Sequence, residues 1–157
     1  MRSIFWAIVT SGLLAVSAMA EPLQPREGWV VNPTTKNYSD LIADLKKAVK
    51  ANKMGVVTQA GPTKAAANRG ITIPGNRVIG VFNNKFAVRT LALSTAAMIE
   101  APIRFYVTEN PDQTATLAYK TPSHVFAPYM DEVGAELVEV AAELDVIFAQ
   151  IAAAAAQ

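Results

Sequence analysis

The chain contains no cysteine and one histidine. The absence of thiols excludes cysteine nucleophiles, disulfide exchange, iron–sulfur ligation and thiolate zinc sites. The histidine, His124, has no second histidine at metal-binding spacing and no acidic cluster beside it, as a histidine-based metal site would require. We therefore expect no metal and no other cofactor.

Patterns that indicate catalysis are also scarce. A catalytic triad needs a histidine that is oriented by an acid and paired with a nucleophile, and Ser123 precedes His124 directly, an arrangement that rarely gives this geometry. Gly61, Gly75 and Gly80 are isolated, so none of them forms a glycine-rich phosphate loop. No catalytic residue can be assigned, and a role without catalysis is favoured.

The chain also has little net charge. Its formal charge is +1, and after Arg2 there are thirteen basic and thirteen acidic residues. Nucleic-acid binding needs a positive field that neutralises phosphates, and no basic stripe interleaved with aromatic residues is present. We expect no nucleic-acid partner.

The first twenty residues have the pattern of a secretory signal peptide. Arg2 precedes an apolar stretch over residues 4–16, which is shorter than the roughly 20 residues of a membrane span. Ala18-Met19-Ala20 is a small-x-small cleavage signal. We predict cleavage after Ala20 and a soluble periplasmic or secreted protein that has no membrane association after cleavage; the alternative is an uncleaved anchor.

The remaining chain is expected to hold a lead-in with an edge strand over residues 21–37 and one α+β domain over residues 38–157. Trp29 begins a short strand candidate, which Pro33 limits or places at a sheet edge. Ser39 is the expected N-cap of a first helix that ends at Gly55.

A hairpin is the clearest local pattern. Two runs of alternating apolar and polar residues, 103–108 and 115–120, flank the turn sequence Asn110-Pro111-Asp112-Gln113. One face of this hairpin should belong to the core. The other, which carries Arg104, Tyr106 and Thr116, could be an interface.

Apolar residues at spacings of three and four predict a long C-terminal helix over residues 131–153. Its wetter side carries a row of glutamates, and the first helix carries a row of lysines. If the two helices pack side by side, these rows could form a complementary seam. The rows are Glu132, Glu136, Glu139 and Glu143 on the last helix, and Lys46, Lys47, Lys50 and Lys53 on the first.

Four segments in a fixed order carry a resemblance to a known family. They are the helix 40–52 with Met54-Gly55-Val56-Val57; Ala65-Ala66-Ala67 leading through Ile73-Pro74 into residues 78–84; residues 101–107; and residues 118–122. Over about residues 38–129 the chain resembles the domain-of-unknown-function 302 (DUF302) family, in its exported branch. The resemblance implies a two-layer α+β fold, with helices on one face of an antiparallel sheet, that is often dimeric and has no established activity.

The chain departs from this family at two places. Many members have an Asp-His pair after the second strand, where this chain has residues 59–62, Gln-Ala-Gly-Pro, so no metal or acid–base role is carried over. Many have Gly-Asn-Pro where this chain has Asn83-Asn84-Lys85. The match at Asn84 makes that residue a candidate for the site.

Three further residues are candidates for ligand binding. Glu100 could act as a general base and Arg104 as an anion clamp, although a local ion pair or an exposed arginine also explains them. Tyr106 shares a hairpin face with Arg104.

The expected function is non-catalytic binding of a small molecule or a protein by a homodimer. The alternatives are a small periplasmic enzyme with a site at Glu100 and Arg104, and a metal-handling stress protein.

Overall fold

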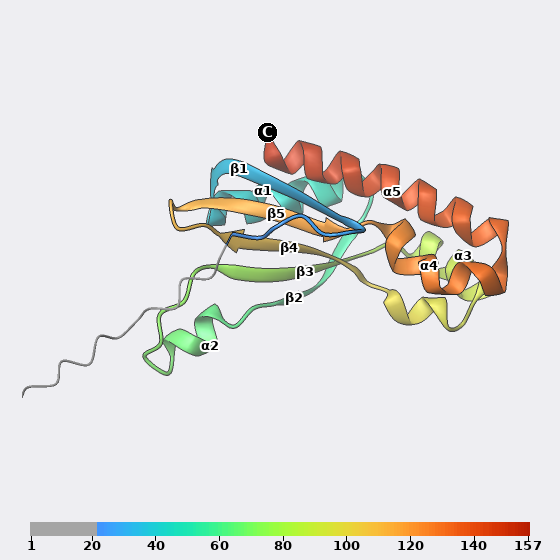
Figure 1. Cartoon of the computed structure of the whole chain (residues 1–157), viewed down its shortest axis with the longest axis horizontal. Coiled ribbons are helices and arrows are strands. Elements are labelled where there is room, and N and C mark those ends of the chain that lie inside the picture. The colour runs from blue at the N-terminus through green and yellow to red at the C-terminus, as the bar shows by residue number, and fades with distance from the viewer. Residues whose placement is uncertain (1–21) are drawn as a thin grey trace, which may run out of the picture.

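The computed structural model describes residues 22–157, and the predicted signal peptide and its cleavage point lie outside this range. Five strands form one sheet in the order β1-β5-β4-β3-β2, and each neighbouring pair is antiparallel (Figure 1). The strands are β1 (Trp29–Asn37), β2 (Gly55–Ala60), β3 (Asn76–Phe82), β4 (Ile103–Glu109) and β5 (Thr114–Lys120). The predicted edge strand at Trp29 and the predicted hairpin are therefore both confirmed.

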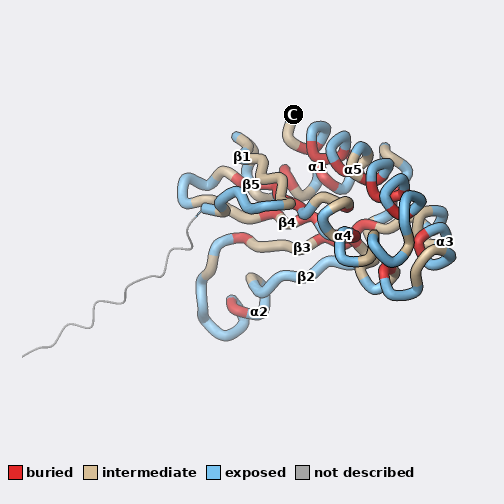
Figure 2. Tube along the Cα trace, turned by 45° about the vertical axis from the view of Figure 1, so that its right-hand side comes forward, coloured by how far each residue is buried: buried red, intermediate tan, exposed pale blue. Residues whose placement is uncertain are grey.

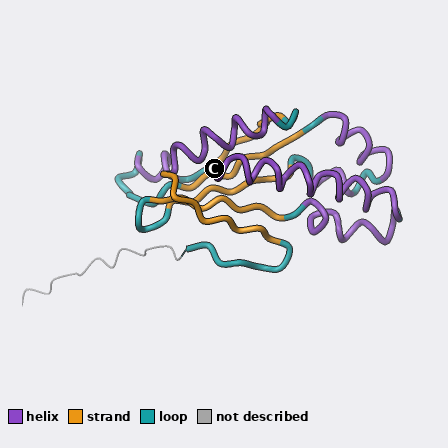
Figure 3. Tube along the Cα trace, turned by 90° about the horizontal axis from the view of Figure 1, so that it is seen from above, coloured by secondary structure: helices purple, strands orange, loops and turns teal. Residues whose placement is uncertain are grey.

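Most of the helices make up the second layer and one end of the molecule, whereas α2 lies at the β2 edge of the sheet (Figure 1). They are α1 (Tyr38–Ala51), α2 (Thr63–Ala67), α3 (Asn84–Leu93), the 3₁₀ helix η1 (Ala97–Glu100), α4 (Pro122–Val133) and α5 (Ala135–Ala156). Helices α1 and α5 pack against each other on one face of the sheet, and α3, η1 and α4 gather at one end (Figures 1 and 3). The α+β class and the long C-terminal helix are confirmed.

The core lies between the sheet and the pair α1 and α5. Phe105 of β4 stacks on Phe148 of α5, with ring centroids 4.7 Å apart, and Tyr119 of β5 tilts against both rings. Leu41 and Leu45 close the core from α1 and are fully buried. In Figure 2 the exposed residues predominate at β2 and α2, at the far edge from this core.

Helix α1 begins one residue before the predicted cap. Asn37, not Ser39, is the N-cap, because its backbone is extended and its side-chain oxygen accepts a hydrogen bond from the Asp40 N–H at 2.9 Å. The Ser39 hydroxyl donates to the same oxygen at 2.7 Å. The serine therefore supports the cap from inside the first turn.

The predicted C-terminal helix is divided at Gly134. This glycine has a φ of 85°, a value that side chains with a Cβ rarely adopt, and α4 ends there while α5 begins. The preceding helix α4 has twelve residues and includes residues 131–133, which the sequence had placed in the long helix. The predicted start of the long helix at residue 131 was therefore wrong.

The lysine and glutamate rows do not form a seam. Helices α1 and α5 are neighbours, as that hypothesis required, but the ion pairs within residues 22–157 are Lys36–Asp44, Lys47–Asp44 and Arg89–Glu143. The contact between α1 and α5 consists of buried apolar side chains. Glu143 instead accepts two hydrogen bonds from Arg89 of α3, both at 2.8 Å.

The Arg89–Glu143 pair gives a prediction about pH. Hydrogen bonds from Arg89 hold the pKa of Glu143 below its usual value, against an opposing effect of burial. A carboxyl group whose pKa is lowered in the folded state stabilises the fold above its unfolded pKa, and this stabilisation disappears as the pH falls through the folded value. We expect Arg89→Met to lower the urea midpoint slightly at pH 7, and this difference to shrink below about pH 4.

Urea titrations of both proteins across this pH range measure the effect. The matched control is Arg69→Met, an exposed position outside the three ion pairs of the described chain. A difference for Arg89→Met that stays constant with pH would assign the loss to its contact with the Phe86 ring instead.

Candidate functional site

The alternation along β4 and β5 gives the sheet two unlike faces. Phe105 and Val107 point toward α1 and α5 and are fully buried, whereas Arg104 and Tyr106 point to the opposite side. We call this opposite side the open face. It carries the hairpin residues that the sequence indicated as an interface.

Strand register assembles the open face from four strands. Trp29 of β1 lies opposite Lys120 of β5, and Gly80 of β3 lies opposite Arg104 of β4. In the next row, Tyr106 lies between Val78 and Ala118. Residues that are far apart in the sequence are thus brought into two adjacent rows.

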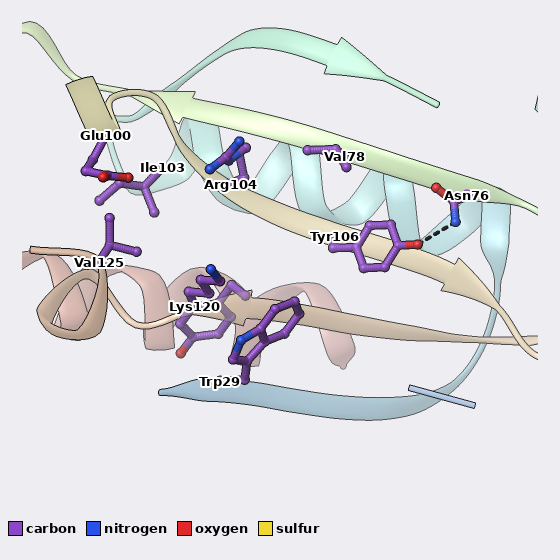
Figure 4. Close-up of a pocket in the computed structure, with 10 residues that line it drawn as sticks. Trp29, Asn76, Val78, Glu100, Ile103, Arg104, Tyr106, Lys120 and Val125 are labelled. Carbon is purple, nitrogen blue, oxygen red and sulfur yellow. Dashed lines mark hydrogen bonds between the residues drawn. The ribbon is translucent and has the colours of Figure 1, made fainter. Parts of the chain in front are cut away.

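A cavity of about 360 Å³ lies over these rows. Its polar and aromatic lining comes from Trp29, Asn76, Glu100, Arg104, Tyr106, Tyr119 and Lys120, and the apolar side chains of Val78, Ile103 and Val125 complete it. Figure 4 shows Glu100, Ile103 and Val125 at one end and the Asn76–Tyr106 hydrogen bond toward the other. A ligand here would contact both charged groups and an apolar surface.

The two cations of the cavity, Arg104 and Lys120, have no acidic partner among residues 22–157. Arg104 and Lys120 are exposed, and neither belongs to an ion pair formed by residues 22–157. The Lys120 ammonium lies 5.7 Å from the centroid of the Trp29 ring, in the range of a cation–π contact. Like charges on neighbouring strands disfavour the fold, so an anion bound between them would relieve that repulsion.

The hydrogen-bond partner of Glu100 is Tyr129, not Arg104. Its carboxylate accepts a hydrogen bond of 2.8 Å from the Tyr129 hydroxyl. This hydrogen bond, with burial and the charges of Glu100 and Glu132, raises the pKa of Tyr129. Glu100 and Arg104 line the same cavity without forming an ion pair, so of the two simpler explanations the exposed arginine applies.

Three of the four candidate residues lie together. Glu100, Arg104 and Tyr106 line the cavity, whereas Asn84 is the exposed first residue of α3 and lies outside its lining. The neighbouring Asn83 caps α3, accepting from the Lys85 N–H at 2.8 Å and donating to the Lys53 carbonyl oxygen at 2.8 Å. The asparagine pair therefore has a structural role through Asn83.

Sequence reasoning did not identify Trp29, Asn76, Val78 or Lys120 as lining residues. Lys120 could have been predicted, because it lies two and four residues after Ala118 and Thr116 and so shares the polar face of the predicted hairpin with them. The others needed the strand order, which places β1 beside β5 and β3 beside β4.

No group of three or more His, Asp or Glu side chains within residues 22–157 is arranged to hold a metal ion. Of the helices in the same range, none has the length and apolar character needed to cross a membrane.

Comparisons with known proteins agree with this architecture. No curated protein matches the chain. The crystal structure of an uncharacterized conserved protein DUF302 from Bacillus stearothermophilus superposes with a TM-score of 0.73 at 17% sequence identity, covering 84% of this chain and 100% of that one. At this identity the likeness shows a shared fold.

The sequence model of one family matches most of the chain. It is described as Domain of unknown function DUF302, and it matches residues 30–154. This range extends the resemblance found over residues 38–129 in both directions, so that it includes most of β1 and nearly all of α5. The chain belongs to the DUF302 family.

Proposed function

We propose that this protein is a non-catalytic binding protein that takes a small anionic molecule with an aromatic or apolar part on the open face. The observation that carries the proposal is the pair Arg104 and Lys120, two cations without acidic partners in the described chain, beside one cavity.

The composition of the cavity supports both parts of such a ligand. The guanidinium and ammonium groups suit a carboxylate, sulfonate or phosphate. Trp29, Tyr106 and Val78 offer surface for a ring or a short apolar chain. The volume of about 360 Å³ lies at the small end of the range for ligand pockets.

We propose further that the protein acts in the periplasm as a homodimer. The signal-peptide pattern before Glu21 supports export, and the resemblance to an often dimeric family supports the dimer. Cell fractionation with N-terminal sequencing tests the first point, and a chain found in the cytoplasm with residues 1–20 retained would contradict it. Sedimentation over a range of concentrations tests the second, and a strictly monomeric profile would remove it.

A second candidate function is a small periplasmic enzyme. It is favoured by the position of Glu100 and Arg104 in one cavity, where a carboxylate could move a proton on a ligand held by the arginine. Glu100→Gln distinguishes the two functions. A binding protein would keep its affinity and show no turnover before or after the change, whereas an enzyme would lose turnover.

The binding proposal gives a prediction with a matched pair of probes. The anionic dye 8-anilinonaphthalene-1-sulfonate should bind, and energy transfer from Trp29 should report it. The chain has two tryptophans, and the other one, Trp6, lies in the predicted signal peptide. We expect Arg104→Met to lower the affinity for this dye roughly tenfold. Because Arg104 is exposed, this loss is near the lower limit of the free energy that a hydrogen bond to a charged group contributes.

The neutral counterpart, N-phenyl-1-naphthylamine, should be affected much less by Arg104→Met. The control variant is Lys64→Met, which removes an exposed cation from α2, outside the cavity. Equal losses for the charged and neutral dyes would contradict anion recognition, and unchanged binding of both would remove Arg104 from the site.

A further inference from the structure

The chain before β1 runs across the open face. In Figure 1, residues 22–28 pass in front of β4 and β5, and in Figure 3 this loop lies on the side of the strands away from α1. At one end, Pro22 and Leu23 line a second cavity of about 280 Å³ together with Thr108 and Asn110 near the hairpin turn. At the other end, the Gly28 carbonyl oxygen accepts a hydrogen bond of 2.9 Å from the Thr121 N–H, where α4 begins.

Burial on the open face is consistent with this course of the chain. Thr116 and Ala118 of β5 pair with Pro33 and Val31 of β1 and point to the open side. They are nevertheless only 3% and 0% exposed. Neighbouring side chains contribute to this burial, and residues 22–28 are the main chain that Figure 1 shows over β5 on this side.

One end of this segment is fixed by hydrogen bonds. The Trp29 N–H donates to the Arg26 carbonyl oxygen at 3.0 Å, which closes a tight turn. Gly28 lies inside that turn with a φ of 69°, and a Cβ at this position would collide with the His124 ring. The turn is therefore suited to act as a hinge at a fixed point beside α4.

The other end is held more weakly. Within residues 22–157, the side-chain hydrogen bond of the segment before the turn is local, from the Gln24 amide to the Pro22 carbonyl oxygen. The half-buried Leu23 side chain lines the second cavity and is the apolar side chain that this segment places beside Ile73 and Pro74. Segments with few buried contacts open at low free-energy cost.

We propose that residues 22–27 form a strap that reversibly covers the open face and swings about Gly28 to uncover it. Tyr106 and Asn76 line both the ligand cavity and the second cavity, which Leu23 also lines. A ligand and the strap would therefore be neighbours, and release of the strap would control entry. This last point rests on the proposed binding function, whereas the movement of the strap does not.

The movement can be measured without a ligand, because the chain has no cysteine. Ala118 and Ala115 lie in the same strand, both are 0% exposed, and they point to opposite faces. We expect a cysteine in Ala118→Cys to react with a thiol reagent much faster than one in Ala115→Cys. The first needs only the strap to open, and the second needs the core to open.

A second substitution ties this labelling to the strap. Leu23→Asp should speed labelling of the Ala118→Cys protein roughly tenfold, because it removes the apolar contact, and should leave Ala115→Cys unchanged. The control is Gln24→Asp, which adds the same charge at an exposed neighbouring position. Equal labelling rates at the two cysteines, or an unchanged rate at Ala118→Cys in the presence of Leu23→Asp, would contradict the proposed movement of the strap.

Trypsin provides a measurement that needs no cysteine, in case either cysteine variant fails to fold. Cleavage after Arg26, inside the strap, requires that segment to leave the sheet. Leu23→Asp should accelerate this cut roughly tenfold, by the same loss of apolar contact, and Gln24→Asp should not. The same cleavage rate in the unchanged protein, Leu23→Asp and Gln24→Asp would contradict the proposed movement of the strap.

Dye kinetics then separate the two proposals. If Leu23→Asp speeds association of 8-anilinonaphthalene-1-sulfonate, the strap controls entry, and an unchanged rate despite faster labelling would refute that control. If the dye does not bind at all, the proposed function fails and entry control fails with it, while labelling and cleavage still decide whether the strap moves.

Discussion

Phe148→Ala is expected to lower the free energy of unfolding by about 3–5 kcal/mol, the range for removing a large aromatic side chain from a core. Phe148 is 0% exposed and stacks on Phe105 with an angle of 12° between the rings. It also contacts Tyr119, at 5.7 Å between centroids. One side chain thus joins α5 to two central strands, and alanine would leave a cavity between the layers.

Urea unfolding followed by circular dichroism measures this loss. The control is Val146→Ala in the same helix, where the valine is 57% exposed and the change should be within about 0.5 kcal/mol. If the two variants were equally stable, α5 would not be packed on the sheet through Phe148.

Gly80→Ala is expected to destabilise the fold by about 1–3 kcal/mol, the range for overpacking a filled site. A Cβ at Gly80 would lie 2.9 Å from Cγ of Pro102 and would collide with the Thr58 hydroxyl. The proline ring is rigid and cannot turn aside. Because Gly80 pairs with Arg104, the adjustment should also disturb the ligand cavity and weaken dye binding.

Two further variants test whether contacts of the added Cβ with Thr58 and Pro102 cause the loss of stability. Gly55→Ala also changes a strand glycine, but its Cβ would meet one atom at an ordinary 3.6 Å, so little effect is expected. Adding Thr58→Ala to Gly80→Ala should restore part of the lost stability, because the collision with the Thr58 hydroxyl is removed and the close contact with Pro102 remains. The absence of any recovery in the double variant would place the whole cost on the proline.

The parts of the fold that depend on local patterns could be predicted from the sequence. The hairpin of β4 and β5 follows from alternation on both sides of a four-residue turn, and the turn closes with a hydrogen bond from the Gln113 N–H to the Asn110 carbonyl oxygen. The face that carries Arg104 and Tyr106 follows from the same alternation. The strand pattern alone is therefore sufficient to place two neighbouring residues of the candidate site on one face.

The other parts depend on contacts between distant segments or on backbone angles. Nothing near Trp29 or Asn76 indicates that β1 and β3 flank the hairpin, so their contribution to the cavity could not be predicted. Glycine is a residue type that ends helices, but the apolar spacing continues across Gly134, and only its φ of 85° shows that α4 ends there. The asparagine that caps α1 competed with a serine two residues later, and both residue types suit an N-cap.

The pairing of β1 with β5 has a consequence for the order of folding. The strand that begins at Trp29 has its sheet partner at residues 114–120, so its backbone groups stay unpaired until most of the chain has been synthesised. Closing such a long loop is entropically costly, and folds rich in distant pairings fold slowly. If the chain is exported from its N-terminus as proposed, the first strand to emerge would be among the last to join the sheet, and folding would be completed after passage.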